Sequence, residues 1–160
     1  RPAQVLDDHA LLLDAARARL VGSPRERLGD WAANRRILGI GRAPRILPVT
    51  EAWHVGVLLI GDDRVFATGE VLRARHDAVR GYTAEAQRAR SERAAAAFRG
   101  GFAEGEVLHL GWTEMDAAAV DRGESSGILS LVGGVPHVAW STTGPPRPLA
   151  AYLDDMLSLR

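Results

Sequence analysis

The stretch AWHVGVLLI (residues 52–60), followed by GDDR (61–64) and VFATGEVLR (65–73), decides the fold class of this chain. Its two outer segments are rich in β-branched and aliphatic residues, which favour strands. The glycine and aspartates between them are typical turn residues. We therefore predict a β-hairpin with strands over residues 52–60 and 65–73, preceded by a short, proline-interrupted edge strand over 45–50.

A second hairpin is predicted further along the chain. Two glycines, Gly133 and Gly134, separate apolar runs over residues 128–132 and 135–141. Glycine pairs between such runs favour a tight turn, because both central residues can adopt positive φ. One more strand is expected over residues 106–112.

Four helices are expected around these strands. The second of them rests on SPRE (residues 23–26), which offers an N-cap serine, proline at the first helical position and glutamate three residues after the cap. Helices at both ends and one between strand groups predict an α+β fold, in which an antiparallel sheet built from hairpins packs its helices mainly on one face. The length fits a single domain over residues 1–160. The expected helices span residues 4–20, 23–38, 83–98 and 149–159.

All twenty basic side chains are arginine, and the chain has neither lysine nor cysteine. Schiff-base chemistry on lysine, thiolate nucleophiles, thiolate metal sites and disulfides are therefore excluded. Arginine stays charged, so it can bind and position anions but cannot act as a base. The apolar runs are too short to suggest a membrane span, and a cytoplasmic location is taken as the default. No cofactor is expected.

The formal net charge is zero, but charge is unevenly distributed along the chain. Residues 23–99 contain fourteen arginines and nine acidic residues, whereas residues 100–160 contain three arginines and eight acidic residues. These stretches either fold against each other and cancel, or they present a basic face for an anionic partner or complementary surfaces for self-association. The zero balance argues against a nucleic-acid partner, which usually requires a much more basic domain.

Two motifs match functional signatures by their letters only. GESSG (residues 123–127) has the spacing of a nucleophile elbow, but a strand is expected after Ser125 where that motif requires a helix. GIG (residues 39–41) begins like a dinucleotide-binding fingerprint, but Pro44 stands where the third glycine belongs. We expect loops at both places.

Three histidines, His54, His109 and His137, fall in predicted strands and are the catalytic candidates. Alternation along each strand puts a tryptophan on the face opposite the histidine, so the indoles are expected in the core and the imidazoles on the reverse face. Neighbouring strands in register would bring three imidazoles together, as a zinc site requires. The spacing contains no short two-ligand element, and no metal site is expected.

Three arginines near predicted loops and strand ends, Arg42, Arg45 and Arg73, are the candidate ligand-binding residues. Guanidinium groups hold carboxylates and phosphates through paired hydrogen bonds. No combination of nucleophile, base and orienting group occurs in a suitable context, so we expect a non-catalytic binding or interaction domain that acts as a homodimer. The alternative is a small enzyme or ligand-binding protein for an anionic metabolite, with arginine anchors and a strand histidine.

Overall fold

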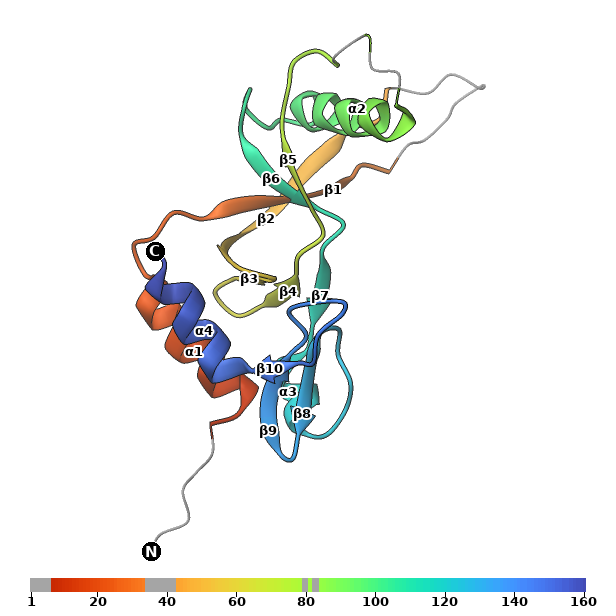
Figure 1. Ribbon diagram of the computed structural model, residues 1–160. Coiled ribbons are helices and arrows are strands. Elements are labelled where there is room, and N and C mark those ends of the chain that lie inside the picture. Colours follow the sequence, from red (N-terminus) through yellow and green to blue (C-terminus); the bar gives the residue numbers. More distant parts are fainter. Residues whose placement is uncertain (1–6, 34–42, 79–80, 82–83) are drawn as a thin grey trace, which may run out of the picture. The chain divides into compact units, whose positions relative to one another are not determined.

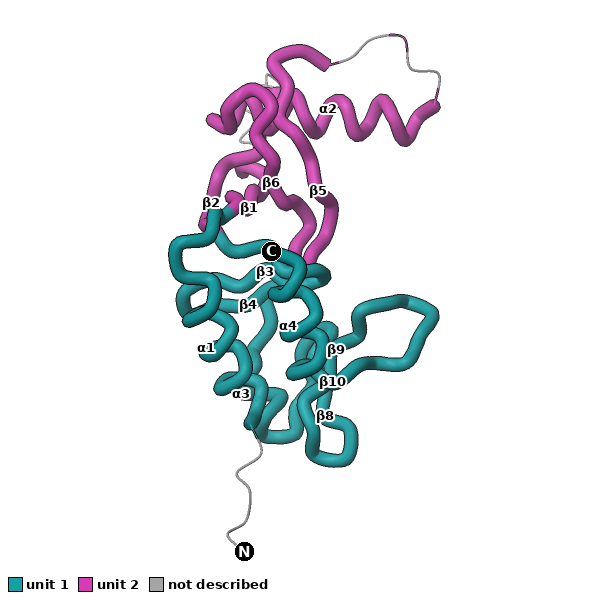
Figure 2. Tube along the Cα trace, turned by 60° about the vertical axis from the view of Figure 1, so that its left-hand side comes forward, with its two compact units in different colours: residues 1–25, 52–67, 113–160 teal, residues 26–51, 68–112 magenta. Residues whose placement is uncertain are grey.

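The computed structural model describes residues 7–33, 43–78, 81 and 84–160. These residues form an α+β protein with a helix near each end and one between two groups of strands (Figure 1). The predicted fold class is therefore confirmed. The chain divides into two compact units (Figure 2). Unit 1 comprises residues 1–25, 52–67 and 113–160, and unit 2 comprises residues 26–51 and 68–112. A single domain over the whole chain stays a prediction.

Unit 1 contains two antiparallel sheets. Their strands are β2 (Ile46–Val55, of which only the last residues belong to this unit), β3 (Leu58–Ile60), β4 (Val65–Ala67), β7 (Thr113–Met115), β8 (Leu129–Val132), β9 (Val135–Val138) and β10 (Arg147–Pro148). The first sheet has the order β2-β3-β4-β7, and the second has the order β10-β9-β8. The turns of both predicted hairpins are present, between β3 and β4 and between β8 and β9. The continuous strand predicted over residues 65–73 is wrong, because this segment divides into β4, which pairs with β3 and β7, and β5 (Glu70–Arg73), which pairs with another strand.

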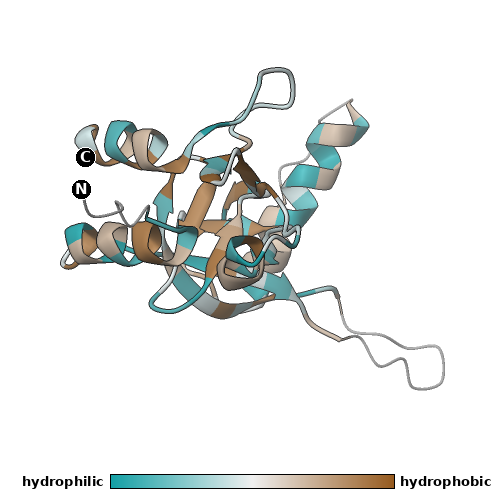
Figure 3. Cartoon of the chain, turned by 90° about the horizontal axis from the view of Figure 1, so that it is seen from below, coloured by the Kyte–Doolittle hydropathy of each residue, from teal (hydrophilic) through white to brown (hydrophobic). Residues whose placement is uncertain are grey.

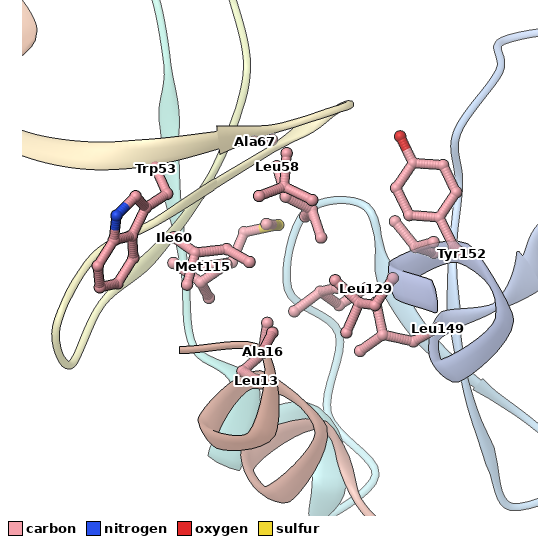
Figure 4. Packing of buried hydrophobic residues seen from close by; sticks show 14 of the residues in the cluster. Leu13, Ala16, Trp53, Leu58, Ile60, Ala67, Met115, Leu129, Leu149 and Tyr152 are labelled. Carbon is pink, nitrogen blue, oxygen red and sulfur yellow. The ribbon is translucent and has the colours of Figure 1, made fainter. Parts of the chain in front are cut away.

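Helices of unit 1 pack around one apolar core. They are α1 (His9–Leu20), α3 (Ala117–Asp121) and α4 (Leu149–Ser158). Helix α1 contacts α3 and α4, and α4 contacts β9. Leu13, Leu58 and Leu149 are among the fully buried side chains that meet there (Figure 4). Burial of each such side chain contributes about 1.5–3 kcal/mol. The helices predicted over residues 4–20 and 149–159 are confirmed from His9 to Leu20 and from Leu149 to Ser158.

A tight turn separates β2 from β3, where the sequence pattern predicted one continuous strand over residues 52–60. Gly56 in this turn has a φ of 60°, a left-handed conformation that glycine adopts without steric cost. Next to it, the backbone N–H of Val57 donates a hydrogen bond to the hydroxyl of Tyr152 at 2.9 Å. The turn therefore depends on Tyr152 of α4, 95 residues further along the chain, and no local sequence pattern predicts this contact.

Unit 2 is a small sheet with one helix. Its elements are β1 (Glu26–Trp31), the first residues of β2, β5 (Glu70–Arg73), β6 (Val107–Leu110) and α2 (Glu85–Arg99). The strand order is β5-β6-β1-β2, so β5 is an edge strand; β5 and β6 are antiparallel, whereas β1 and β6 are parallel. Ala96 and Ala97 of α2 pack with Leu72 and Leu108 of the sheet. This confirms the helix predicted over residues 83–98.

The helix predicted over residues 23–38 is wrong where the structure describes it, because β1 occupies this segment. Residues 34–42 lie outside the described residues. Leu28 is fully buried in β1, and a Cβ at Gly29 would lie only 2.6 Å from the side chain of Ile46. Pairing with β6 and this close packing outweigh the local capping signal, which is a weak preference by comparison.

Apolar residues concentrate on the strands, whereas the helices carry both polar and apolar residues (Figure 3). This is the distribution expected when the helices turn one side to a core and the other to solvent. None of the helices in the described part of the chain combines the length and apolar character needed to cross a bilayer.

Candidate functional site

A cleft of about 540 Å³ lies in unit 2, between the edge strand β5 and helix α2. Its volume is in the range of protein sites that bind small ligands. The described lining combines apolar side chains with three arginines, Arg73, Arg75 and Arg90, and contains neither a carboxylate nor a histidine. This cleft is the candidate functional site.

The strand side of the cleft is the outer edge of β5. In an antiparallel pair, alternate residues direct both backbone groups at the neighbouring strand. Ala74 N donates to Glu106 O at 2.9 Å, and Ala74 O accepts from Gly105 N at 2.7 Å, so the backbone of Ala74 faces the β6 side. The same alternation turns the backbone groups of Val71 and Arg73 away from β6 and toward the cleft.

The helix side of the cleft is one face of α2. Gln87, Arg90, Ser91 and Ala94 follow the spacing i, i+3, i+4 and i+7, which places them on the same side of a helix. Ala94 is buried, and its carbonyl accepts a hydrogen bond from Arg75 N at 3.1 Å. This bond joins the helix to the edge of the sheet just beyond the end of β5.

The three arginines of the cleft are exposed and held by local partners. Arg73 Nη1 donates to a backbone carbonyl at 3.1 Å, and Arg75 Nη1 lies 3.6 Å from Glu104 Oε1. Arg90 Nη2 donates to Val71 O at 2.8 Å. Exposed guanidinium groups on flexible stems can turn toward a ligand, because the contacts they give up are individually weak.

Glu70 neutralises part of this positive charge without lining the cleft. Arg93 donates to both of its carboxylate oxygens, at 2.6 and 2.7 Å, whereas Arg90 Nη1 lies 3.2 Å away. The hydrogen bond from Arg93 holds the pKa of Glu70 below its ordinary value, although partial burial opposes this. Glu70 is therefore ionised and pairs mainly with Arg93, while it makes one longer contact with Arg90.

Of the predicted ligand-binding arginines that the structure describes, Arg73 lines the cleft and Arg45 does not. Arg45 is half-buried before β2, where its carbonyl accepts from Ala32 N at 2.9 Å; Arg42 lies outside the described residues. Arg75 was missed although it follows Arg73 with the two-residue period of a strand. Arg90 was missed because no local pattern places the helix predicted over residues 83–98 beside a particular strand, and only tertiary structure brings it next to β5.

His54 and His137 lie in different sheets of unit 1, in β2 and β9. The Nε2 atom of His54 is 2.9 Å from Gly56 O, and the Nδ1 atom of His137 is 2.8 Å from Val135 O. Each imidazole thus contacts a backbone carbonyl two residues away. A catalytic role for either stays a prediction.

His109 and the tryptophans depart in part from the expected alternation. His109 is fully buried in β6 of unit 2, and its Nε2 lies 2.8 Å from Glu26 Oε1 on β1. The carboxylate pairs with the Nε2 atom of an imidazole that would be costly to bury alone. Trp53 is buried as expected, and Trp112 is half-buried, but Trp140 is 44% exposed because it lies beyond the end of β9. The inward position predicted for Trp140 is wrong.

The cleft combines positive charge with a partly apolar lining, and these two features bear on its function. No protein-family model, curated protein or solved structure gives a match to the chain. Three arginines over a partly apolar floor can bind and orient an anion, whereas they supply no base or nucleophile.

Proposed function

We propose that this protein is a non-catalytic binding domain whose unit 2 binds an anionic ligand in the cleft between β5 and α2. The observation that carries the proposal is that Arg73, Arg75 and Arg90 line one cleft without a carboxylate in its described lining. Guanidinium groups form charge-assisted hydrogen bonds with carboxylates and phosphates and remain charged at any physiological pH. The apolar part of the lining favours a ligand with an apolar portion beside its charge.

The lining favours binding over catalysis. Ser91 offers a hydroxyl, but the described lining has no histidine or carboxylate to activate it. An enzyme for an anionic metabolite with a strand histidine stays a prediction, because His54, His109 and His137 do not line this cleft. Self-association as a homodimer, which rests on the charge distribution along the chain, also stays a prediction.

Titration of citrate and pyrophosphate into ¹⁵N-labelled protein at constant ionic strength tests the proposal. We expect amide chemical-shift changes that concentrate on β5 and the facing side of α2. Arg90→Gln is expected to weaken binding about tenfold, because a charge-assisted hydrogen bond contributes about 1.5–3 kcal/mol.

The matched control is Arg88→Gln. Arg88 lies on the same helix two residues before Arg90, pairs with Glu85 at 2.9 Å and does not line the cleft. Its substitution should leave the affinity unchanged. Equal affinities of the wild type and Arg90→Gln, or shift changes confined to other regions, would refute the anion site.

A further inference from the structure

We infer that the anionic ligand of this cleft is an acidic peptide segment in extended conformation, which adds to β5 as a further strand. The inference rests on the proposed anion site and names its class of ligand. The cleft runs between an edge strand and a helix, an arrangement in which a peptide backbone pairs with the strand while its side chains contact the helix.

The outer edge of β5 offers the backbone groups that such pairing requires. Val71 and Arg73 direct their N–H and C=O groups away from β6. The C=O of Val71 already accepts Arg90 Nη2 at 2.8 Å. Among the described residues none hydrogen-bonds the other three groups, which are the N–H of Val71 and both backbone groups of Arg73. These three groups can pair with a peptide of any sequence.

Helix α2 limits the length of the added strand. The carbonyl of Ala94 accepts from Arg75 N at 3.1 Å and so occupies the next outward position of the edge. Pairing is thereby confined to the segment from Val71 to Arg73. A short peptide segment suffices to fill this length.

The side chains along the edge define the composition of the peptide. Val71 and Arg73 lie on one face of the sheet, and Val107 lies directly opposite Arg73 in the β5–β6 register. Val71 is 38% exposed, and an edge strand that exposes an apolar side chain is prone to pair with another chain. Leu72 points to the other face, where it packs with Ala96 and Ala97 of α2. Successive residues of an added strand also point to opposite faces. In an alternating peptide the apolar residues can therefore lie beside Val71 and Val107, while the acidic residues point to the face of α2, which carries Arg90.

Fluorescence anisotropy with a fluorescein-labelled peptide of three Val-Glu repeats tests the inference on the intact chain. We expect the Val-Glu peptide to bind at least tenfold tighter than the matching Val-Lys peptide, because charge complementarity selects the acidic partner. N-methylation of a Val-Glu peptide at alternate amides should lower its affinity at least tenfold, because the methylated amides cannot donate backbone hydrogen bonds to β5. Val71→Pro should also weaken binding, since it removes an outward N–H without breaking the pairing with β6.

Three outcomes overturn the inference in distinguishable ways. If the N-methylated peptides, in both methylation registers, bind as tightly as the unmodified one, strand addition is wrong while an anion site remains. If citrate and pyrophosphate bind at the cleft but the Val-Glu peptide does not, the ligand is a small anion and the proposed function stands. If none of these probes binds, both proposals fall. The N-methylated peptides keep the test decisive even if Val71→Pro does not fold.

Discussion

Asp121 caps the N-terminus of α1 although 112 residues separate it from His9. Its Oδ1 atom accepts from His9 N at 2.9 Å and lies 2.7 Å from His9 Nδ1, while its Oδ2 atom accepts from Ala10 N at 3.1 Å. His9 is fully buried. The carboxylate satisfies N–H groups that the first turn of a helix leaves without partners, and its charge suits the helix dipole. This contact fastens α1 to α3 within unit 1.

Asp121→Asn is expected to lower the free energy of unfolding by about 2–3 kcal/mol, because an amide loses the charge and turns a donor toward N–H groups. Urea denaturation followed by circular dichroism measures the loss. Asp154→Asn is the matched control, since Asp154 is 74% exposed and pairs with Arg19 at the surface. It should cost less than about 0.5 kcal/mol. Similar losses in the two variants would contradict a special role for Asp121.

The same contact predicts a loss of stability in acid. Burial by itself opposes ionisation of Asp121, but hydrogen bonds from the backbone N–H groups of His9 and Ala10, and then from the His9 side chain, bring its pKa below the ordinary 3.8. The unfolded carboxyl therefore binds a proton at higher pH than the folded one. The stabilisation is complete above the unfolded pKa and is lost as the pH falls through the folded pKa. Urea denaturation at a series of acid pH values gives the free energy of unfolding as a function of pH. We expect this free energy to fall less steeply with decreasing pH in Asp121→Asn than in the wild type, and identical slopes would contradict the role of Asp121.

Gly56 and Gly133 form a matched pair, with φ values of 60° and 58°. A Cβ at Gly56 would lie 1.9 Å from the hydroxyl oxygen of Tyr152, whereas one at Gly133 would meet nothing within 4 Å. Gly133→Ala should therefore lower the free energy of unfolding only by the strain of a left-handed backbone at alanine, about 1–2 kcal/mol. Gly56→Ala should cost at least about 1 kcal/mol more, because Tyr152 must move and its hydrogen bond to Val57 is lost. Thermal unfolding of both variants measures the difference, and equal melting temperatures would show that the turn does not depend on Tyr152.

Glu70→Gln is expected to strengthen the binding of pyrophosphate, because it removes a negative charge that Arg93 and Arg90 now share. We expect about a threefold gain at low ionic strength, which should shrink as salt screens the charges. Glu114→Gln is the control, since Glu114 is bound in the same two-point manner by Arg64 but belongs to unit 1. Weaker binding by Glu70→Gln would mean that Glu70 organises the arginines rather than competing with the ligand.

Local patterns predicted the elements whose stability comes from neighbours in the sequence. The helix now seen as α2 is marked by its run of alanines, and the turn of the β8–β9 hairpin by Gly133 and Gly134, because helix propensity and positive φ are properties of single residues. Of the arginines that line the candidate site, the sequence patterns predicted only Arg73. Arg75 and Arg90 belong to the same cleft, but the pattern does not say that α2 lies beside β5.

By itself, the sequence determined the α+β class, the turns of both hairpins, three of the helices and the exclusion of lysine and cysteine chemistry. Tertiary structure alone decided that residues 26–31 form a strand, that β5 is left at an edge, and that three arginines meet across one cleft. The reason is that pairing between strands depends on partners far along the chain. A helix-capping signal contributes about 1 kcal/mol. The hydrogen bonds of a strand ladder and the burial of one face together outweigh it, so the segment forms a strand.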